Sequence, residues 1–226
     1  MSVFNLINQN LDLNNKIVAG LERLSQVFRI LLWEKAKEHS LSPIQIQLLI
    51  FIKYHSSDKT TVSYLAQEFN FTKPTISDAI KILKQKKLIK KVADNNDTRS
   101  YTIQLTALGK KIVSATDNFA NPITEILTST NETDKLIVWE NVSNLISILN
   151  KQGIITIQRT CHNCSNYTLK NEKPYCNLLN QKLLTRDIRI DCEEFELAQV
   201  KFTDSKRASD KGERITKGLP QGWRTE

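Results

Sequence analysis

The feature that most constrains the fold is a change of hydrophobic period near residue 88. Apolar residues recur at spacings of four and three in FTKPTISDAIKILKQKKLI, at Ile76, Ile80 and Leu83, which predicts the buried stripe of a helix. The next run, LIKKVADNNDTRSYTIQLT, alternates apolar and polar positions on both sides of a turn-rich DNND. This pattern predicts a small antiparallel hairpin. A polar-faced helix that leads directly into a hairpin is typical of a winged helix-turn-helix.

Two further helical segments precede this helix. Ser42 is a good N-cap and Pro43 is tolerated in a first turn, so IQIQLLIFI is predicted to continue as a helix with a buried face. VSYLAQEFN then predicts a short helix that ends at Asn70. Thr72 can cap the following helix, with Pro74 in its first turn. Three helices followed by a hairpin, in this order, are typical of a DNA-binding protein. We expect the third helix, which Thr72 can cap, to lie in the DNA major groove.

Long helices are predicted on both sides of this core. Residues 17–33 carry an apolar stripe. After the hairpin, we expect a helix over 107–127, bent or interrupted near Pro122, and another over 134–150. The stripes of the first and last long helices have no other partner within a winged-helix core, which predicts a symmetric homodimer. The alternative is that these helices pack only on their own subunit.

Net charge indicates the chemistry of the partner. The chain carries a formal charge of +8 and a pI near 9.3. Residues 41–106 contain ten basic and five acidic residues, so more than half of the excess lies in less than a third of the chain. This concentration favours an anionic partner, for which we predict double-stranded DNA. The sequence shows no basic leader and no apolar run long enough for a bilayer, so we expect a cytoplasmic protein with no membrane partner.

Three stretches of the chain resemble the MarR family of winged-helix transcriptional regulators over about residues 10–150. They are LSPIQIQLLIFI, VSYLAQEFNFTKPTISDAIKILKQKKLI and DNNDTRSYTIQLTALGKK. The most specific part is Asp97-x-Arg99, followed by Leu105-Thr106-x-x-Gly109. The resemblance implies a two-fold dimer built by the terminal helices and a helix that reads the major groove. It also implies a wing arginine and a small-molecule effector.

Carried over by position, the resemblance places candidate DNA contacts on one helix and on the wing. The candidate residues are Thr72, Lys73, Thr75, Ser77, Lys81, Asp97 and Arg99. Asp97 would orient Arg99 toward the DNA, and the alternative is a surface ion pair between the two. Thr72 is equally suited to capping the helix and to contacting a phosphate. The family usually has glycine where this chain has Lys87, and a lysine in a left-handed conformation is strained.

Four cysteines follow the last predicted helix. Cys161 and Cys164 form a C-x2-C knuckle that can place two thiolates on one metal, and Cys176 and Cys192 follow at wider spacings. One knuckle with two isolated cysteines favours a four-cysteine iron-sulfur cluster, with zinc as the alternative. The third alternative is disulfides or free thiols, and a reducing cytosol disfavours it. His162 is expected either to lie beside the metal without binding it or to be exposed, and His39 and His55 are expected at the surface.

These patterns predict a mainly α fold with a small β-hairpin wing. Residues 1–152 would form a winged helix-turn-helix core flanked by long dimerisation helices, residues 153–202 a small four-cysteine module and residues 203–226 a disordered tail. The predicted function is a sequence-specific DNA-binding transcription regulator that acts as a repressor. We expect it to respond to redox or iron status through the cluster.

Two alternatives stay open. One is a regulator with a structural zinc and a small-molecule effector. The other is an iron-sulfur enzyme or electron carrier that the winged helix docks to nucleic acid. The sequence contains no Gly-rich phosphate loop, HExxH or nucleophile elbow, so we expect no enzyme.

Overall fold

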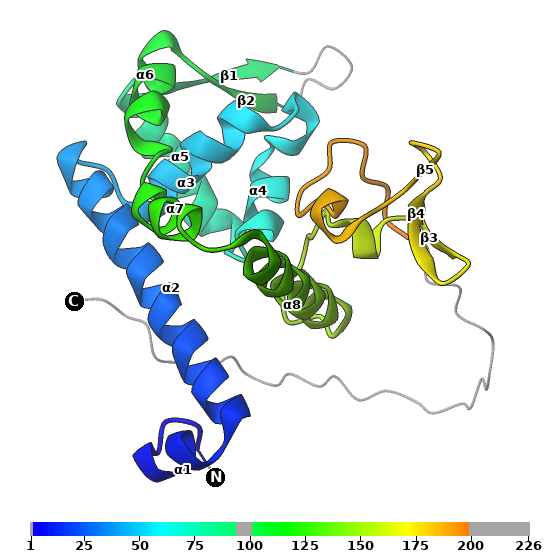
Figure 1. The fold of residues 1–226 in the computed structure, drawn as a ribbon. Helices are drawn as coiled ribbons and strands as arrows, with labels where there is room; N and C mark the ends of the chain where they lie inside the picture. Colours follow the sequence, from blue (N-terminus) through cyan, green and yellow to red (C-terminus); the bar gives the residue numbers. More distant parts are fainter. Residues whose placement is uncertain (1, 94–100, 199–226) are drawn as a thin grey trace, which may run out of the picture.

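The computed structural model describes residues 2–93 and 101–198 (Figure 1). Two parts of the sequence prediction therefore lie outside the described residues: the tail over 203–226 and the wing tip with Asp97 and Arg99. None of the helices in the described part of the chain combines the length and apolar character needed to cross a membrane.

The elements follow one another as helices, a hairpin, more helices and a small second sheet. The α-helices are α1 (Leu6–Leu11), α2 (Leu13–Glu38), α3 (Pro43–Tyr54), α4 (Val62–Glu68), α5 (Lys73–Gln85), α6 (Ala107–Thr116), α7 (Asn121–Thr128) and α8 (Glu132–Lys151). The strands are β1 (Ile89–Ala93), β2 (Tyr101–Leu105), β3 (Tyr167–Lys170), β4 (Lys173–Cys176) and β5 (Gln181–Lys182). Short 3-10 turns are η1 (Ser57–Lys59), η2 (Cys161–Asn163) and η3 (Thr185–Asp187).

The winged helix-turn-helix core is confirmed. Helices α3, α4 and α5 bury a common cluster of apolar side chains, including Leu48, Leu65 and Ile80, from which water is excluded. Strands β1 and β2 pair antiparallel, from Ile89 with Leu105 to Ala93 with Tyr101. The hairpin is joined to the helices because the N–H of Ile103 donates to the carbonyl of Thr60 at 3.2 Å.

The long helices differ in detail from their predicted bounds. The helix predicted over 107–127 is two helices, α6 and α7, with Pro122 in the first turn of α7. Proline is tolerated there because its missing N–H has no intrahelical partner. The helix predicted over 134–150 is α8, and Asn131 caps it by accepting a hydrogen bond from the N–H of Asp134 at 2.9 Å.

Helix α2 has little contact with the rest of its own chain. It extends away from the helical core, with only α1 at its far end (Figure 1). Only Ala19, Leu32 and Ala36 are buried along its 26 residues. Leu24 is 52% exposed and Phe28 is 44% exposed. An apolar stripe this exposed indicates a surface that another molecule covers.

Lys87 occupies the left-handed position at the end of α5, with φ of 57°. The N–H of Leu88 donates to the carbonyl of Leu83, and that of Lys87 donates to the carbonyl of Lys84, the pattern of a Schellman C-cap. Glycine is the usual residue at this position because a Cβ is strained there. The strain expected from the sequence is therefore present, and the turn still forms.

Replacing Lys87 with glycine is expected to stabilise the fold. Removing the left-handed strain of about 1–2 kcal/mol exceeds the cost of about 0.5–1 kcal/mol for the added freedom of the unfolded chain. Chemical denaturation should show a free energy of unfolding raised by about 0.5–1 kcal/mol. The control is Lys84→Gly, which removes the same charge from a right-handed position in the last turn of α5 and should destabilise by up to about 1 kcal/mol. If both variants lost the same free energy of unfolding, the assignment of strain to Lys87 would be contradicted.

Candidate nucleic-acid interface and four-cysteine site

Helix α5 presents two chemically different faces. Ile76, Ala79, Ile80 and Leu83 are buried against the core. The predicted DNA-contact residues of this helix are all exposed, and they are Thr72, Lys73, Thr75, Ser77 and Lys81. The structure therefore brings five of the seven predicted residues onto one polar helix surface. The other two, Asp97 and Arg99, lie outside the described residues.

The start of α5 is built by Thr72. Its Oγ1 accepts a hydrogen bond from the N–H of Thr75 at 3.3 Å and lies 2.8 Å from the hydroxyl oxygen of Thr75. The capping role expected of Thr72 is confirmed. The helix N-terminus also carries partial positive charge, which favours an approaching phosphate. Lys73, at the first helical position, adds a full positive charge to the same end.

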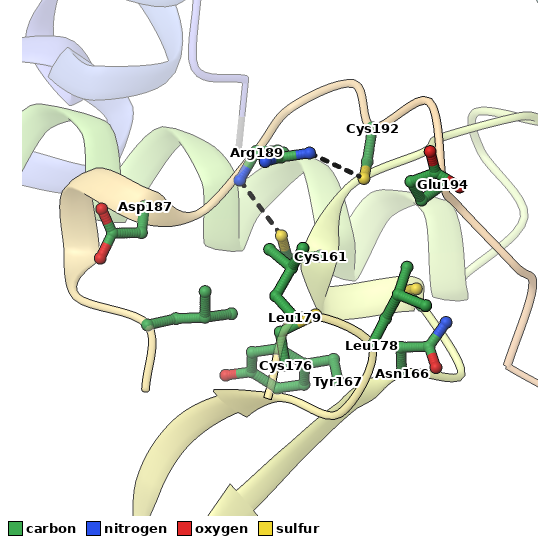
Figure 2. Close-up of a pocket in the computed structure, with 12 residues that line it drawn as sticks. Cys161, Asn166, Tyr167, Cys176, Leu178, Leu179, Asp187, Arg189, Cys192 and Glu194 are labelled. Carbon is green, nitrogen blue, oxygen red and sulfur yellow. Dashed lines mark hydrogen bonds between the residues drawn. The ribbon is translucent and has the colours of Figure 1, made fainter. Parts of the chain in front are cut away.

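The four cysteines line one small cavity of about 30 Å³ (Figure 2). Cys161 begins the tight turn η2 and Cys164 directly follows it, Cys176 ends β4, and Cys192 follows η3. All four are free thiols in the structure. The cavity is also lined by Tyr167, Leu178, Leu179 and Leu183, and by the polar residues Asn166, Asp187, Arg189 and Glu194.

Backbone hydrogen bonds hold the cysteine segments against one another. The N–H of Cys161 donates to the carbonyl of Arg189, and the N–H of Cys192 donates to the carbonyl of Arg159, both at 3.1 Å. Within the knuckle, the N–H of Cys164 donates to the carbonyl of Cys161 at 3.0 Å. The chain from Arg189 to Cys192 therefore lies directly alongside the chain that enters the knuckle.

Arg189 donates to two of the sulfur atoms. Its backbone N–H lies 3.2 Å from Sγ of Cys161, and its Nη1 lies 3.5 Å from Sγ of Cys192 (Figure 2). Burial raises the pKa of the Cys161 thiol, the Arg189 N–H opposes that shift, and the other three cysteines add to it. The thiols therefore lie close enough to disfavour one another as anions, a repulsion that a bound cation would relieve.

The donor set suits a thiolate-bound metal, although it is not drawn together in this structure. Within residues 2–93 and 101–198, no three His, Cys, Asp or Glu side chains stand ready to hold an ion. Four thiols on one cavity, two N–H donors to sulfur and a mostly apolar lining do match the surroundings of metal thiolates. The four-cysteine metal site therefore stays a prediction, with all its predicted residues on one cavity.

His55 is not the surface residue that the sequence predicted. Its side chain is 17% exposed, its ring stacks on Phe51 with centroids 3.7 Å apart, and its Nε2 lies 2.8 Å from Oδ2 of Asp191. The prediction was wrong because the carboxylate is 136 residues away in the sequence. His162 is half-buried beside Tyr167, and burial lowers its pKa.

Sequence reasoning missed Arg159, whose side chain is 5% exposed. Its guanidinium donates to Asp191 at 2.5 and 2.8 Å, and to Glu68 at 2.7 and 3.1 Å. It also donates to the hydroxyl of Tyr64 at 2.9 Å. We call Arg159, Asp191, Glu68, Tyr64 and His55 the Arg159 junction. The only signal in the sequence is an arginine two residues before a metal-type knuckle.

Opposite charges keep the junction ionised. Burial lowers the pKa of the Arg159 guanidinium, but its hydrogen bonds to Asp191 and Glu68 outweigh this effect and raise the pKa. Burial raises the pKa of Asp191, and the hydrogen bonds from Arg159 and His55 reverse that effect and lower the pKa below its usual value. The junction therefore holds a buried positive charge between two carboxylates.

Comparison with known proteins gives a family match for the core. Residues 39–100 match the model of the MarR family. The chain is similar to S. aureus MepR in a complex with DNA, with 26% identity and a TM-score of 0.52 over 58% of this chain and 97% of MepR. It is also similar to S. aureus MepR in its DNA-binding conformation, with 25% identity and a TM-score of 0.52 over 59% and 98% of the two chains. No curated protein shows a significant match.

Proposed function

We propose that this chain is a transcription regulator of the MarR family that binds double-stranded DNA as a homodimer and acts as a repressor. The family model over residues 39–100 and the likeness to MepR support the family and the winged helix-turn-helix. The MepR structure is a DNA complex, which favours the same class of partner for this chain. The observation that carries the proposal is the exposed polar face of α5.

That face has the size and chemistry of a major-groove reader. A helix that buries one narrow stripe, as α5 does with Ile76, Ile80 and Leu83, leaves its other side free to enter a groove about 12 Å wide. Thr75 and Ser77 can reach base edges or phosphates, and Lys81 adds charge one turn further along. Phosphate contacts from lysines supply affinity, and base contacts supply specificity.

The dimer is supported by the exposed helices. Most apolar side chains of α2, among them Leu24 and Phe28, are exposed in their own chain, and Ile137, Val138 and Ile148 of α8 are also more than half exposed. A second copy that covers these surfaces would pair two α5 helices for two half-sites of the operator. A small-molecule effector and the absence of enzymatic activity stay predictions from the sequence.

The Arg99→Ala variant tests the wing contact. A wing arginine contributes charge and minor-groove contacts, so its loss should weaken binding to a selected duplex by about 10–100-fold and reduce the salt dependence by about one ion. Fluorescence anisotropy at several salt concentrations measures both quantities. The control is Arg186→Ala in η3, which removes an arginine from the cysteine segment and should leave affinity unchanged. Equal affinity for Arg99→Ala and the native protein would contradict the contact.

We also propose that Cys161, Cys164, Cys176 and Cys192 hold one metal centre. The shared cavity, the apolar lining and the two N–H donors of Arg189 support this proposal. The single knuckle favours an iron-sulfur cluster. A single zinc ion is the alternative, because four thiolates complete its tetrahedral coordination. A cluster would supply a centre that oxidants or iron shortage can dismantle, whereas zinc would supply a fixed cross-link.

Metal analysis of anaerobically purified protein separates these outcomes. We expect one centre per chain, seen either as several irons with sulfide and broad visible absorbance or as one zinc in a colourless protein. Cys164→Ser should lose most of the metal, because three thiolates and a hydroxyl bind a soft ion less tightly. The matched control Ser165→Cys keeps all four thiols and should retain the metal. Metal-free native protein, or a Cys164→Ser variant with full metal content, would contradict the site.

A further inference from the structure

We propose that the Arg159 junction transmits the state of the four-cysteine site to α4, and through α4 to the DNA-reading helix α5. The inference rests on the proposed function and adds to it the route by which the two sites affect each other. Its elements are Arg159 and Asp191 on the cysteine side, and Glu68, Tyr64 and His55 on the winged-helix side.

The cysteine side of the junction is built into the site itself. Arg159 lies two residues before Cys161, and Asp191 lies immediately before Cys192. The carbonyl of Arg159 accepts the N–H of Cys192 at 3.1 Å, while its side chain binds the carboxylate of Asp191. A change in how Cys161 or Cys192 is held must therefore move the backbone that positions the guanidinium and its carboxylate.

The winged-helix side of the junction is α4. Glu68 is the last residue of α4, and Tyr64 lies one turn earlier on the same helix. Thr156, also upstream of the knuckle, donates from its hydroxyl to the carbonyl of Gln67. Four hydrogen bonds therefore join one end of α4 to the cysteine segment. Figure 1 shows that segment beside α4.

Helix α4 is closely linked to α5. Its chain reverses at Asn70, which is left-handed with φ of 54°, and Thr72 caps α5 two residues later. Leu65 of α4 and Ile76 of α5 are fully buried in one core. A closely packed core passes on a shift of one helix to its neighbour, because it has little free volume to absorb the movement. A displacement at Glu68 would therefore change the placement of α5.

The energetics make the junction respond as a unit. A buried guanidinium is tolerated only while its partners are in place, since removal of one carboxylate leaves an uncompensated charge away from water. Partial opening is therefore disfavoured. The knuckle is fixed on its other side by Asn163, whose side chain accepts from Ser147 at 2.9 Å and donates to Asn150 at 2.7 Å, both on α8. The cysteine segment thus connects α8 to α4.

A double-mutant cycle on DNA affinity tests the transmission. Cys164→Ser alters the site without touching the junction, and Arg159→Met opens the junction while keeping a long apolar side chain. Each single variant is expected to change the affinity for a selected duplex by about 5–150-fold, the usual range of coupling between sites. The double variant should differ from Arg159→Met by less than about twofold, because the signal has already lost its route. The control cycle pairs Cys164→Ser with Arg186→Met and should be additive.

Hydrogen exchange gives a readout that does not require DNA binding. The amides of Leu65 and Phe69, which donate within α4, should exchange faster in Cys164→Ser and in Arg159→Met, with no further increase in the double variant. If the α4 amides exchange faster in these variants but the native protein binds no DNA, the proposed function would be refuted and the transmission would still be supported. Additive effects in the cycle, or α4 amides that ignore Cys164→Ser in protein that remains folded, would overturn the transmission.

Discussion

Replacing Leu24 with aspartate is expected to split the homodimer and weaken operator binding by about 10²–10⁴-fold. Leu24 is 52% exposed in the single chain and lies in the apolar stripe of α2 with Leu21 and Phe28. A carboxylate at the centre of a dimer interface would be buried without a partner, which is strongly unfavourable. Each separated chain would then bind one half-site of the operator independently. The gain in affinity that a dimer obtains by holding its second reading helix close to the second half-site would be lost.

Light scattering after size-exclusion chromatography should show the mass of one chain for Leu24→Asp and of two chains for the native protein. The matched control is Gln26→Asp, because residues two apart on a helix face different directions. It introduces the same charge on the same helix and should leave a dimer with native affinity. A dimeric Leu24→Asp protein would show that the exposed stripe of α2 is not the contact between subunits.

The Gly109→Ala substitution is expected to destabilise the winged-helix core by about 3 kcal/mol or more. A Cβ at Gly109 would lie 2.0 Å from the carbonyl oxygen of Leu88 and 3.0 Å from its carbon. Both atoms are backbone, so no side-chain rotation relieves the overlap. Helix α6 would have to move away from the base of the hairpin, where the hydroxyl of Thr106 also donates to the carbonyl of Leu88 at 3.1 Å.

Urea denaturation measures this loss as a lower midpoint with an unchanged slope. The control is Ser114→Ala on the exposed side of the same helix, which should change the free energy of unfolding by less than about 0.5 kcal/mol. Similar midpoints for Gly109→Ala and Ser114→Ala would contradict the close approach of α6 to β1. Gly109 lies in a stretch that resembles the MarR family, and the structure supplies a physical reason for a glycine there.

Local patterns predicted the parts of the fold that depend on local physics. The spacing of Ile76, Ile80 and Leu83 identified the buried face of α5, because a helix repeats every 3.6 residues whatever surrounds it. The alternation around the DNND turn identified the hairpin and its strands. The exposed stripe of α2 also followed from its period, since that pattern requires a partner whether or not one is in the same chain.

Contacts between distant segments could not be predicted in this way. Arg159 meets Glu68 across 91 positions and His55 across 104, and no periodicity relates residues so far apart. The cysteine site is an intermediate case. The spacing of the cysteines identified the four thiols that line the cavity. It did not identify the other lining residues: Leu183 lines the cavity, and Lys182 next to it does not. Strand alternation explains Lys182, since successive side chains point to opposite faces.

The central claim is that a dimer of this chain reads DNA through α5 and the wing. Selection from a pool of random duplexes, followed by sequencing, tests this claim most directly. The expected result is an inverted repeat whose half-sites are centred about one helical turn, or about 10 base pairs, apart. It should be lost when Thr75 and Ser77 are both replaced by alanine in a protein that still forms dimers. A pool with no enriched sequence after selection by the native, metal-loaded dimer would contradict the account.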